Sequence, residues 1–268
     1  MKAAYNQRLL LGLKNRYPIL YVKCRDERRL INQITSVSND FFGDDRPLVT
    51  WSCVDGCNGD SALSDPLAML SHIRKSEKEC IYLLKDFPAL FKDNPQIVRA
   101  LRDLYDELLG KLRFVAISHP ELHLPNELQS QAWFVDLGMP DPREIENHLR
   151  SILSQSVKSK PVDETWFAQM VTAMKGLNLE EITHLIYGWE SDNRFDAVSN
   201  LEDVYANKTA TLQKEGCLQF IAKSVKVDEV GGLENLKEWV MSRKHLFNRQ
   251  AFQDGIPMPA GILFMGCL

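Results

Sequence analysis

Residues 19–140 alternate between short apolar runs and stretches with helical spacing, and this alternation restricts the possible folds more than any other feature of the sequence. The apolar, β-rich runs occupy residues 19–24, 47–53, 79–87, 111–119 and 132–138. These runs do not alternate cleanly between apolar and polar residues, as a strand with one solvent-facing side does. Strands of this kind, separated by helices, are typical of a parallel sheet buried on both faces. The sequence therefore predicts a doubly wound α/β domain with five parallel strands.

Three amphipathic helices are predicted between the first four apolar runs. Their apolar residues recur at helical spacing over 30–37, 67–73 and 97–108. Asp65-Pro66 and Asn94-Pro95 supply an N-cap residue and a first helical proline for the second and third of these helices. Helices in these positions provide the crossover connections that a parallel sheet requires.

From residue 141 to residue 216 the pattern is wholly helical. Asp141-Pro142 predicts the start of one helix, and Asn178 with Glu181 has the spacing of a capping box. Apolar residues at helical spacing are typical of a packed core. We therefore expect a helical lid over residues 141–216.

The α/β domain is expected over residues 1–140, and a third unit is expected over residues 217–268. The third unit contains one more amphipathic stretch and a single apolar run at 261–265. One strand cannot form a sheet. We therefore expect residues 217–268 to be a linker and the start of an incomplete second domain.

The composition limits the partners and the compartment that we expect. The formal net charge of −4 leaves no polybasic field for nucleic acid or an anionic membrane. The sequence has no apolar stretch near the length of about 18 residues that a membrane span needs. The six cysteines form no zinc-binding set, and we expect them to be small buried side chains in a reducing compartment. The predicted location is the cytoplasm.

Several segments of the chain resemble parts of AAA-type ATPases. VDEVGGLENLK (227–237) resembles the segment that opens an AAA domain, and GIPMPAGILFMG (255–266) resembles the stretch that leads into its phosphate loop. YPILY (17–21), LKDF (84–87) and GLNLEE (176–181) resemble the amino-terminal half of one subgroup, found in plastids, cyanobacteria and other bacteria. In that subgroup a degenerate P-loop-NTPase-like domain precedes an intact ATPase domain. The resemblance runs from residue 5 to residue 268.

The resemblance implies a nucleotide site in the second AAA domain. Gly266 would be the first glycine of the loop G-x-x-x-x-G-K-[ST], with Cys267 after it, and Glu229, Val230 and Gly231 would border the adenine. ATP and Mg²⁺ are the implied ligands of the complete protein, and a protein partner or a homo-oligomer is implied as well. Residues 1–268 do not include the lysine or the serine or threonine of that loop. We therefore expect this chain to hold only a partial ATP site, to bind neither ligand tightly and to have no ATPase activity by itself.

The first domain has no glycine where a phosphate loop would follow its first strand. The turn reads Cys24-Arg25-Asp26-Glu27-Arg28. A phosphate loop needs glycines so that backbone N–H groups can approach the anion. Asp26 and Glu27 are predicted at the N-terminus of the following helix, where carboxylates interact favourably with the helix dipole and repel a phosphate. We expect that this domain does not bind nucleotide in the usual way.

Polar residues at the ends of two further strands allow an alternative hypothesis. Asp86 follows the third predicted strand and Ser118 ends the fourth. Together with Asp26 and Glu27 they fit a phosphoryl-receiver domain, but the segment after the fifth strand lacks the lysine that such a domain uses. Without a phosphate loop, we interpret Asp86 and Ser118 as vestigial or structural. The pair His119 and His123 is interpreted as part of a solvated loop.

Two principal functions are compatible with the sequence. In the first, the chain is the amino-terminal part of an AAA ATPase that uses ATP and Mg²⁺ to remodel a protein partner. In the second, it is a non-catalytic interaction or assembly module.

Overall fold

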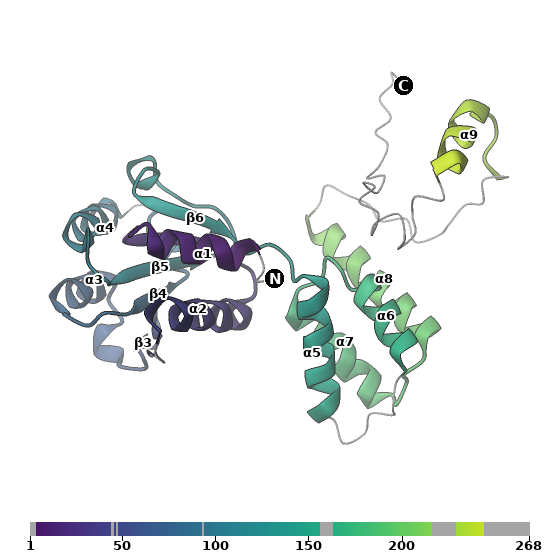
Figure 1. Ribbon diagram of the computed structural model, residues 1–268, viewed down its shortest axis with the longest axis horizontal. Coiled ribbons are helices and arrows are strands. Elements are labelled where there is room, and N and C mark those ends of the chain that lie inside the picture. The colour runs from purple at the N-terminus through teal and green to yellow at the C-terminus, as the bar shows by residue number, and fades with distance from the viewer. Residues whose placement is uncertain are drawn as a thin grey trace. The chain divides into compact units, whose positions relative to one another are not determined.

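The computed structural model describes residues 4–43, 46, 48–92, 94–155, 163–215 and 229–243. The chain divides into two compact units, residues 1–205 and residues 206–268. The first unit begins with a sheet covered by helices and continues into a helical region (Figure 1). The domain boundaries expected at residues 140 and 216 stay predictions.

The sheet contains all five predicted parallel strands. They are β1 (Ile19–Lys23), β2 (Val49–Ser52), β4 (Ile81–Lys85), β5 (Phe114–His119) and β6 (Ala132–Asp136). The strand order is β3-β2-β4-β5-β1-β6, so the first strand lies between the last two. Lys23 is in register with both His119 and Asp136. The carboxyl ends of β1, β5 and β6 therefore meet at one edge of the sheet.

The prediction of a five-stranded sheet is corrected to six strands. The added strand, β3 (Gly56–Cys57), is only two residues long and pairs antiparallel with β2. Gly56 has φ = 71°, and a Cβ atom at this position would lie 1.9 Å from the backbone oxygen of Asp60. A strand this short has no recognisable periodicity, and for that reason sequence patterning missed it.

Two pairs of helices cover the two faces of the sheet. On one face α1 (Ala4–Lys14) and α2 (Glu27–Phe42) pack against apolar residues of β1, β4, β5 and β6. On the other face α3 (Pro66–Lys75) and α4 (Pro95–Leu108) cover β1, β2, β4 and β5. The predicted helices around 30–37, 67–73 and 97–108 are thereby confirmed. The central strands β1, β4 and β5 are buried on both sides, which explains why their sequences lack polar alternation.

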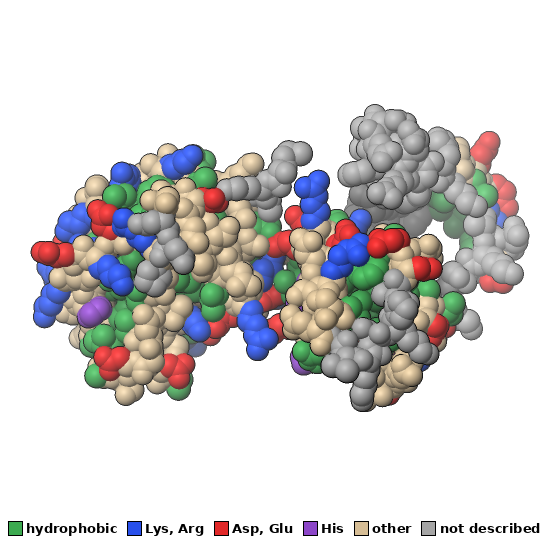
Figure 2. Space-filling view, turned by 60° about the horizontal axis from the view of Figure 1, so that its bottom comes forward, with side chains coloured by type: hydrophobic (Ala, Val, Ile, Leu, Met, Phe, Trp, Pro, Cys, Tyr) green, Lys and Arg blue, Asp and Glu red, His purple; other side chains and the backbone are tan. Residues whose placement is uncertain are grey.

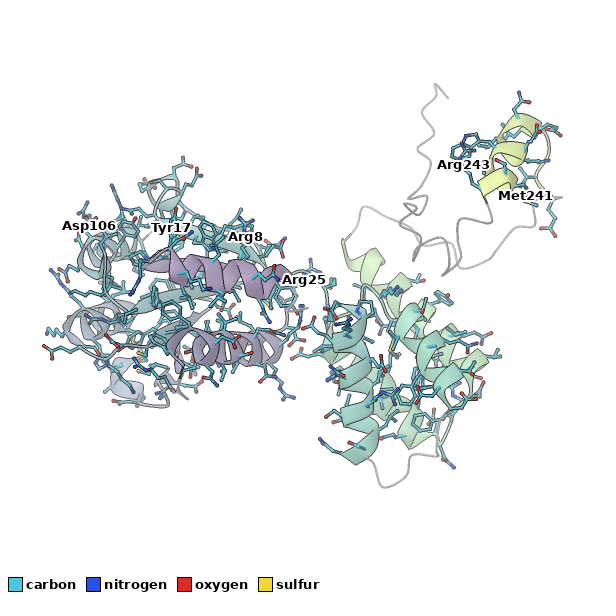
Figure 3. The ribbon with its side chains drawn as sticks, viewed as in Figure 1. Arg8, Tyr17, Arg25, Asp106, Met241 and Arg243 are labelled. Carbon is cyan, nitrogen blue, oxygen red and sulfur yellow. The ribbon has the colours of Figure 1, made fainter. Side chains whose placement is uncertain are left out.

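Helix α1 was not expected from the sequence, and it lies beside the edge strand β6 (Figure 1). The indole Nε1 of Trp133 donates a hydrogen bond to the backbone oxygen of Arg8 at 2.9 Å, and Arg8 Nε donates to the oxygen of Phe134 at 2.8 Å. Arg8 and Tyr17, both labelled in Figure 3, also contact the Trp133 ring. Helix α1 thus covers a sheet edge that would otherwise present unpaired backbone groups.

The helical region has its own apolar core. Its helices are α5 (Pro142–Gln155), α6 (Glu164–Ala173), α7 (Leu179–Ser191) and α8 (Ala197–Glu215). The core is built around buried Trp166 and Trp189, whose ring centroids are 6.0 Å apart. The capping box of Asn178 and Glu181 is confirmed. Asp141 also acts as predicted, because its carboxylate accepts from the backbone N–H of Glu144 at 2.9 Å.

The two helix caps predicted at Asp65 and Asn94 differ in the structure. The Asp65 carboxylate caps α3, whereas Asn94 takes the N-cap position of α4 without a side-chain hydrogen bond.

Cys80 is buried as expected, but Cys53 is exposed. The prediction that Cys53 is buried was wrong, because this residue lies on the turn between β2 and the short strand β3.

The remaining described residues include three short 3₁₀ helices and α9 (Glu234–Arg243). The 3₁₀ helices are η1 (Ser61–Leu63), η2 (Phe87–Leu90) and η3 (Asn126–Leu128). Among the residues that the structure describes, no helix is both long and apolar enough to cross a membrane. Figure 2 shows basic and acidic side chains interspersed over the visible face, consistent with the small net charge of −4. The apolar run predicted as a strand at 261–265 lies outside the described residues.

Candidate functional site

The turn between β1 and α2 occupies the position where a nucleotide-binding α/β domain would hold phosphate. Asp26 is the N-cap of α2, and its carboxylate accepts from the backbone N–H of Arg29 at 2.9 Å. The Asp26 side chain is buried, and Glu27 is the first residue of the helix. The predicted placement of both carboxylates at this N-terminus is confirmed. Asp26 thus uses a helix N–H group that would otherwise be available to an anion.

Charged side chains from the neighbouring strands pair across the same edge. Glu27 Oε1 lies 2.7 Å from Nζ of Lys85, at the end of β4. Lys23 Nζ lies 3.1 Å from Oδ2 of Asp136, at the end of β6. These side chains are partly exposed, so each pair contributes at most about 1 kcal/mol. Both lysines thus already have carboxylate partners.

Arg29 is the group at this edge that sequence reasoning missed. Its guanidinium is buried and donates to the backbone oxygens of Gly138 at 2.7 Å and Leu137 at 3.3 Å. It also forms a two-pronged pair with Glu144, with Nη2 and Nε at 2.9 Å and 3.1 Å from the two carboxylate oxygens. The guanidinium lies 4.9 Å from the centroid of the Tyr5 ring. Arg29 therefore joins α1, α2, the end of β6 and the start of α5.

The electrostatics of this cluster favour the charged pair. Burial alone would raise the pKa of Glu144, but the interactions with Arg29, Tyr5 and the backbone N–H of Asp141 together outweigh it, and the pKa lies below its ordinary value. Burial likewise opposes the charge of Arg29, yet Glu144 raises the Arg29 pKa overall. Burial raises the pKa of Tyr5 to about 12 and that of the neighbouring Cys24 thiol to about 11. Arg29 and Glu144 are thus both ionised at neutral pH, while Tyr5 and Cys24 are neutral.

Asp86 and Ser118 lie at the ends of neighbouring strands, as predicted. Asp86 follows β4 with φ = 51°, an unusual left-handed conformation for a residue other than glycine, and Ser118 is buried in register with Lys85. In the described part of the chain, His, Cys, Asp and Glu side chains form no group of three that could hold a metal ion. Asp26, Glu27 and Asp86 therefore do not converge as the Mg²⁺ site of a receiver domain would require.

The loop that follows His119, the last residue of β5, and contains His123 is anchored by Tyr21 of β1. The Tyr21 hydroxyl donates to the backbone oxygen of Glu121 at 2.7 Å and accepts from the N–H of His123 at 2.9 Å. The two imidazole rings pack edge to face at 4.8 Å, and Nε2 of His123 lies 3.3 Å from a carboxylate oxygen of Glu121. The side chains of Glu121 and His123 are exposed, so this loop is solvated as expected, and its backbone also has a defined conformation.

The partial ATP site is described only in part. Glu229, Val230 and Gly231 are exposed and precede α9. Gly266 and Cys267 lie outside the described residues. The association of these five residues in one adenine and phosphate site therefore stays a prediction.

Comparisons with known proteins agree with the resemblance seen in the sequence. Residues 5–137 match the family model described as the N-terminal domain of SpoVK-like AAA ATPases. Two relatives are described as uncharacterized AAA domain-containing protein ycf46. The protein from Guillardia theta is 30% identical over 263 residues, which cover 96% of this chain and 51% of the relative. The protein from Trieres chinensis is 28% identical over 271 residues, which cover 98% of this chain and 53% of the relative.

The chain therefore spans about half the length of these relatives, and it aligns with the amino-terminal half. Among solved structures, one described as the structural basis for katanin self-assembly matches with a TM-score of 0.51 at 11% identity. That match covers 84% of this chain and 85% of the other chain. At this identity the likeness concerns the fold alone.

Proposed function

We propose that this chain is the non-catalytic, amino-terminal half of an AAA ATPase, because residues 5–137 match the model of SpoVK-like AAA ATPase N-terminal domains. The complete protein would bind and hydrolyse ATP with Mg²⁺ in the domain that begins near residue 229. The α/β domain and the helical lid would serve to bind a protein partner or further copies of the chain. Remodelling of a protein partner is the expected use of the hydrolysis energy.

The observation that carries this proposal is the turn between β1 and α2. A triphosphate needs a glycine-rich loop, free N–H groups at the helix N-terminus and an unpaired lysine. Here the turn has no glycine, Asp26 caps the helix, and Lys23 and Lys85 are paired with carboxylates. The residues present do not fit ATP and Mg²⁺ at this edge. The α/β domain is thus proposed to be a structural descendant of an ATPase domain without its chemistry.

A nucleotide titration tests the non-catalytic assignment. The 268-residue chain is titrated with a fluorescent ATP analogue in the presence of Mg²⁺, and hydrolysis is followed by phosphate release. We expect neither turnover nor saturation below millimolar concentrations. Saturation in the micromolar range that unlabelled ATP reverses would contradict the proposal. Saturation that unlabelled ATP does not reverse reports binding of the dye and leaves the assignment intact.

The second candidate is a stand-alone interaction or assembly module with no ATPase in the same protein. The helix cap of Asp26 and the ion pairs of Lys23 and Lys85 support it equally well, since they concern only the α/β domain. The coding sequence beyond codon 268 separates the two candidates. A reading frame that continues through Gly-x-Gly-Lys-Ser or Gly-x-Gly-Lys-Thr supports the ATPase, and a stop codon supports the separate module.

A further inference from the structure

A groove runs beside the carboxyl ends of β4 and β5. It consists of two adjoining hollows of about 460 Å³ and 410 Å³ that share Phe91 and Pro125. One wall is formed by η2 and the start of α4. The other wall is formed by the loop between β5 and η3. The groove takes no part in the proposed ATPase chemistry.

Both walls of the groove are fixed by contacts to the core. On one side Phe87 packs against Trp51 at 5.4 Å and against Phe91 at 5.9 Å, measured between ring centroids. On the other side the Tyr21 hydroxyl holds the backbone of Glu121 and His123. A groove with walls held in this way needs little ordering when a ligand binds, which lowers the entropic cost of association.

The chemistry of the lining is apolar with a surplus of positive charge. Phe91, Val98, Leu124 and three prolines supply the apolar surface. The cationic side chains are Lys92, Arg99 and Arg102, and Glu127 is the single acidic side chain among the described lining residues. Arg99 pairs with Asp103 on α4, so Lys92 and Arg102 carry most of the uncompensated charge.

Two further features favour a negatively charged ligand. Arg102 Nε is buried and has no hydrogen-bond partner among the described residues. No carboxylate among the described residues pairs with Arg102, so the outer part of its guanidinium is available to a carboxylate from a ligand. The N-terminus of α4 also opens into this groove, and Asn94 makes no side-chain cap there. The positive end of the helix dipole therefore adds to the field of Lys92 and Arg102.

We propose that this groove binds an acidic peptide segment of a partner protein, with one large apolar side chain anchored against Phe91 and carboxylates directed to Lys92 and Arg102. This inference rests on the proposed interaction role of the α/β domain. The apolar lining and the prolines distinguish it from a phosphate site, which needs convergent backbone N–H groups from glycines. An extended peptide satisfies both the apolar surface and the charges.

The proposal is tested with a random peptide library displayed on phage and selected on the 268-residue chain. We expect the enriched peptides to combine aspartate or glutamate with a large apolar residue. Synthetic peptides from the selection, labelled with fluorescein, then give dissociation constants by anisotropy. Binding should weaken as the ionic strength rises, because the contacts at the rim are screened by salt.

Matched variants locate the binding site. Lys92→Glu reverses an exposed charge in the groove, and Lys111→Glu makes the same change at an exposed lysine that does not line it. We expect Lys92→Glu to weaken peptide binding at least about fivefold and Lys111→Glu to change it less than about twofold. Arg102→Gln, which keeps the aliphatic stem, should also weaken binding. Circular dichroism melts of all three variants verify that they are folded.

Three results would overturn the proposal. They are enriched peptides without an excess of acidic residues, selected peptides that bind Lys92→Glu and Arg102→Gln as tightly as the parent chain, and displacement of the peptides by ATP. The last result would mark the groove as a nucleotide site and would appear as saturation in the ATP titration as well. The first two leave that titration unaffected, so failure of the groove is distinguishable from failure of the proposed function.

Discussion

At the scale of single residues, Arg29 determines how the sheet and its helices are joined to the start of α5. Its position on α2 resembles any other helical arginine in the sequence, yet its side chain is 2% exposed and satisfies three backbone carbonyls and Glu144. The planar guanidinium of an arginine can make all of these hydrogen bonds simultaneously, whereas the ammonium group of a lysine cannot. This position therefore requires the shape of the arginine side chain as well as its charge.

Replacement of Arg29 is expected to destabilise the protein strongly. Arg29→Ala should lower the free energy of unfolding by about 2–4 kcal/mol, because Glu144 loses its charged partner and the backbone oxygens around Gly138 lose the guanidinium as a donor. Arg29→Lys should recover only part of this loss. Urea denaturation measures both, with Arg99→Ala as the control, since Arg99 pairs with Asp103 on the exposed face of α4. An Arg29→Ala variant as stable as Arg99→Ala would show that the buried cluster contributes little.

The pKa of Glu144 makes a prediction for acid stability. The folded-state pKa lies below the ordinary value of 4.5, so this carboxylate stabilises the fold above pH 4.5 and the contribution is lost as the pH falls through the lowered pKa. Between pH 5 and pH 3 the free energy of unfolding of Glu144→Gln should therefore fall less than that of the parent chain. The variant lacks the carboxylate whose protonation destabilises the fold in this range. Denaturation midpoints measured across this range test it.

His148 titrates in a separate window and must be distinguished from Glu144. Burial lowers its pKa below the ordinary value of 6.5, so the stability it supports is present above pH 6.5 and declines as the pH falls through the lowered value. The pH dependence of the free energy of unfolding of His148→Gln, compared with that of the parent chain, measures the His148 contribution by itself. An unchanged acid profile in Glu144→Gln, measured against His148→Gln, would contradict the assignment to Glu144.

At the scale of elements, α1 matters because it closes the β6 edge of the sheet. Gly12 permits the close approach of this helix: a Cβ atom at Gly12 would lie 2.6 Å from Cδ1 of Trp133. The Trp133 ring cannot easily move away, since its Nε1 is hydrogen-bonded to the oxygen of Arg8. Helix propensity and packing therefore oppose each other at this position.

We expect packing to prevail at Gly12. In a helix, Gly→Ala normally stabilises by about 1 kcal/mol, but overpacking against a fixed side chain costs about 1–3 kcal/mol. Gly12→Ala should therefore destabilise the protein. Gly188→Ala in α7 is the matched control and should stabilise it, because nothing lies within 4 Å of its Cβ position. Urea midpoints for both variants decide the question. A stabilising Gly12→Ala would mean that α1 is held less closely to β6 than the structure shows.

At the scale of the whole molecule, the apolar cores define what can fold independently. All the buried members of the three core clusters lie between Leu9 and Val204, among the residues that the structure describes. The α/β domain and the helical region thus contain their own cores. This agrees with the division into units at residue 205.

A chain that ends at residue 216 should therefore fold cooperatively. We expect its melting temperature to stay within about 2 °C of that of the 268-residue chain, because no described core contact is removed. Near-ultraviolet circular dichroism, which reports the packing of Trp51, Trp166 and Trp189, monitors the transition. Loss of a cooperative melt would place residues beyond 216 in the core of the first unit.

The sequence by itself determined the main features of the fold. The five parallel strands, the three crossover helices and the capping box at Asn178 follow from periodicities and caps that act within a few residues. The kinship with AAA ATPases and the placement of Asp26 and Glu27 at a helix N-terminus were also readable from contiguous segments. Such features depend on local backbone preferences, which a single sequence contains.

Only the tertiary structure decided which distant residues meet. Arg29 and Glu144 are 115 positions apart, and neither has a local signal that pairs them. The same holds for α1 against β6, for the anchoring of the His123 loop by Tyr21, and for the groove between η2 and η3. The strand order brings these groups together, and it is set by the packing of complete helices on a complete sheet. Long-range packing of this kind leaves no periodic trace in the residues that take part in it.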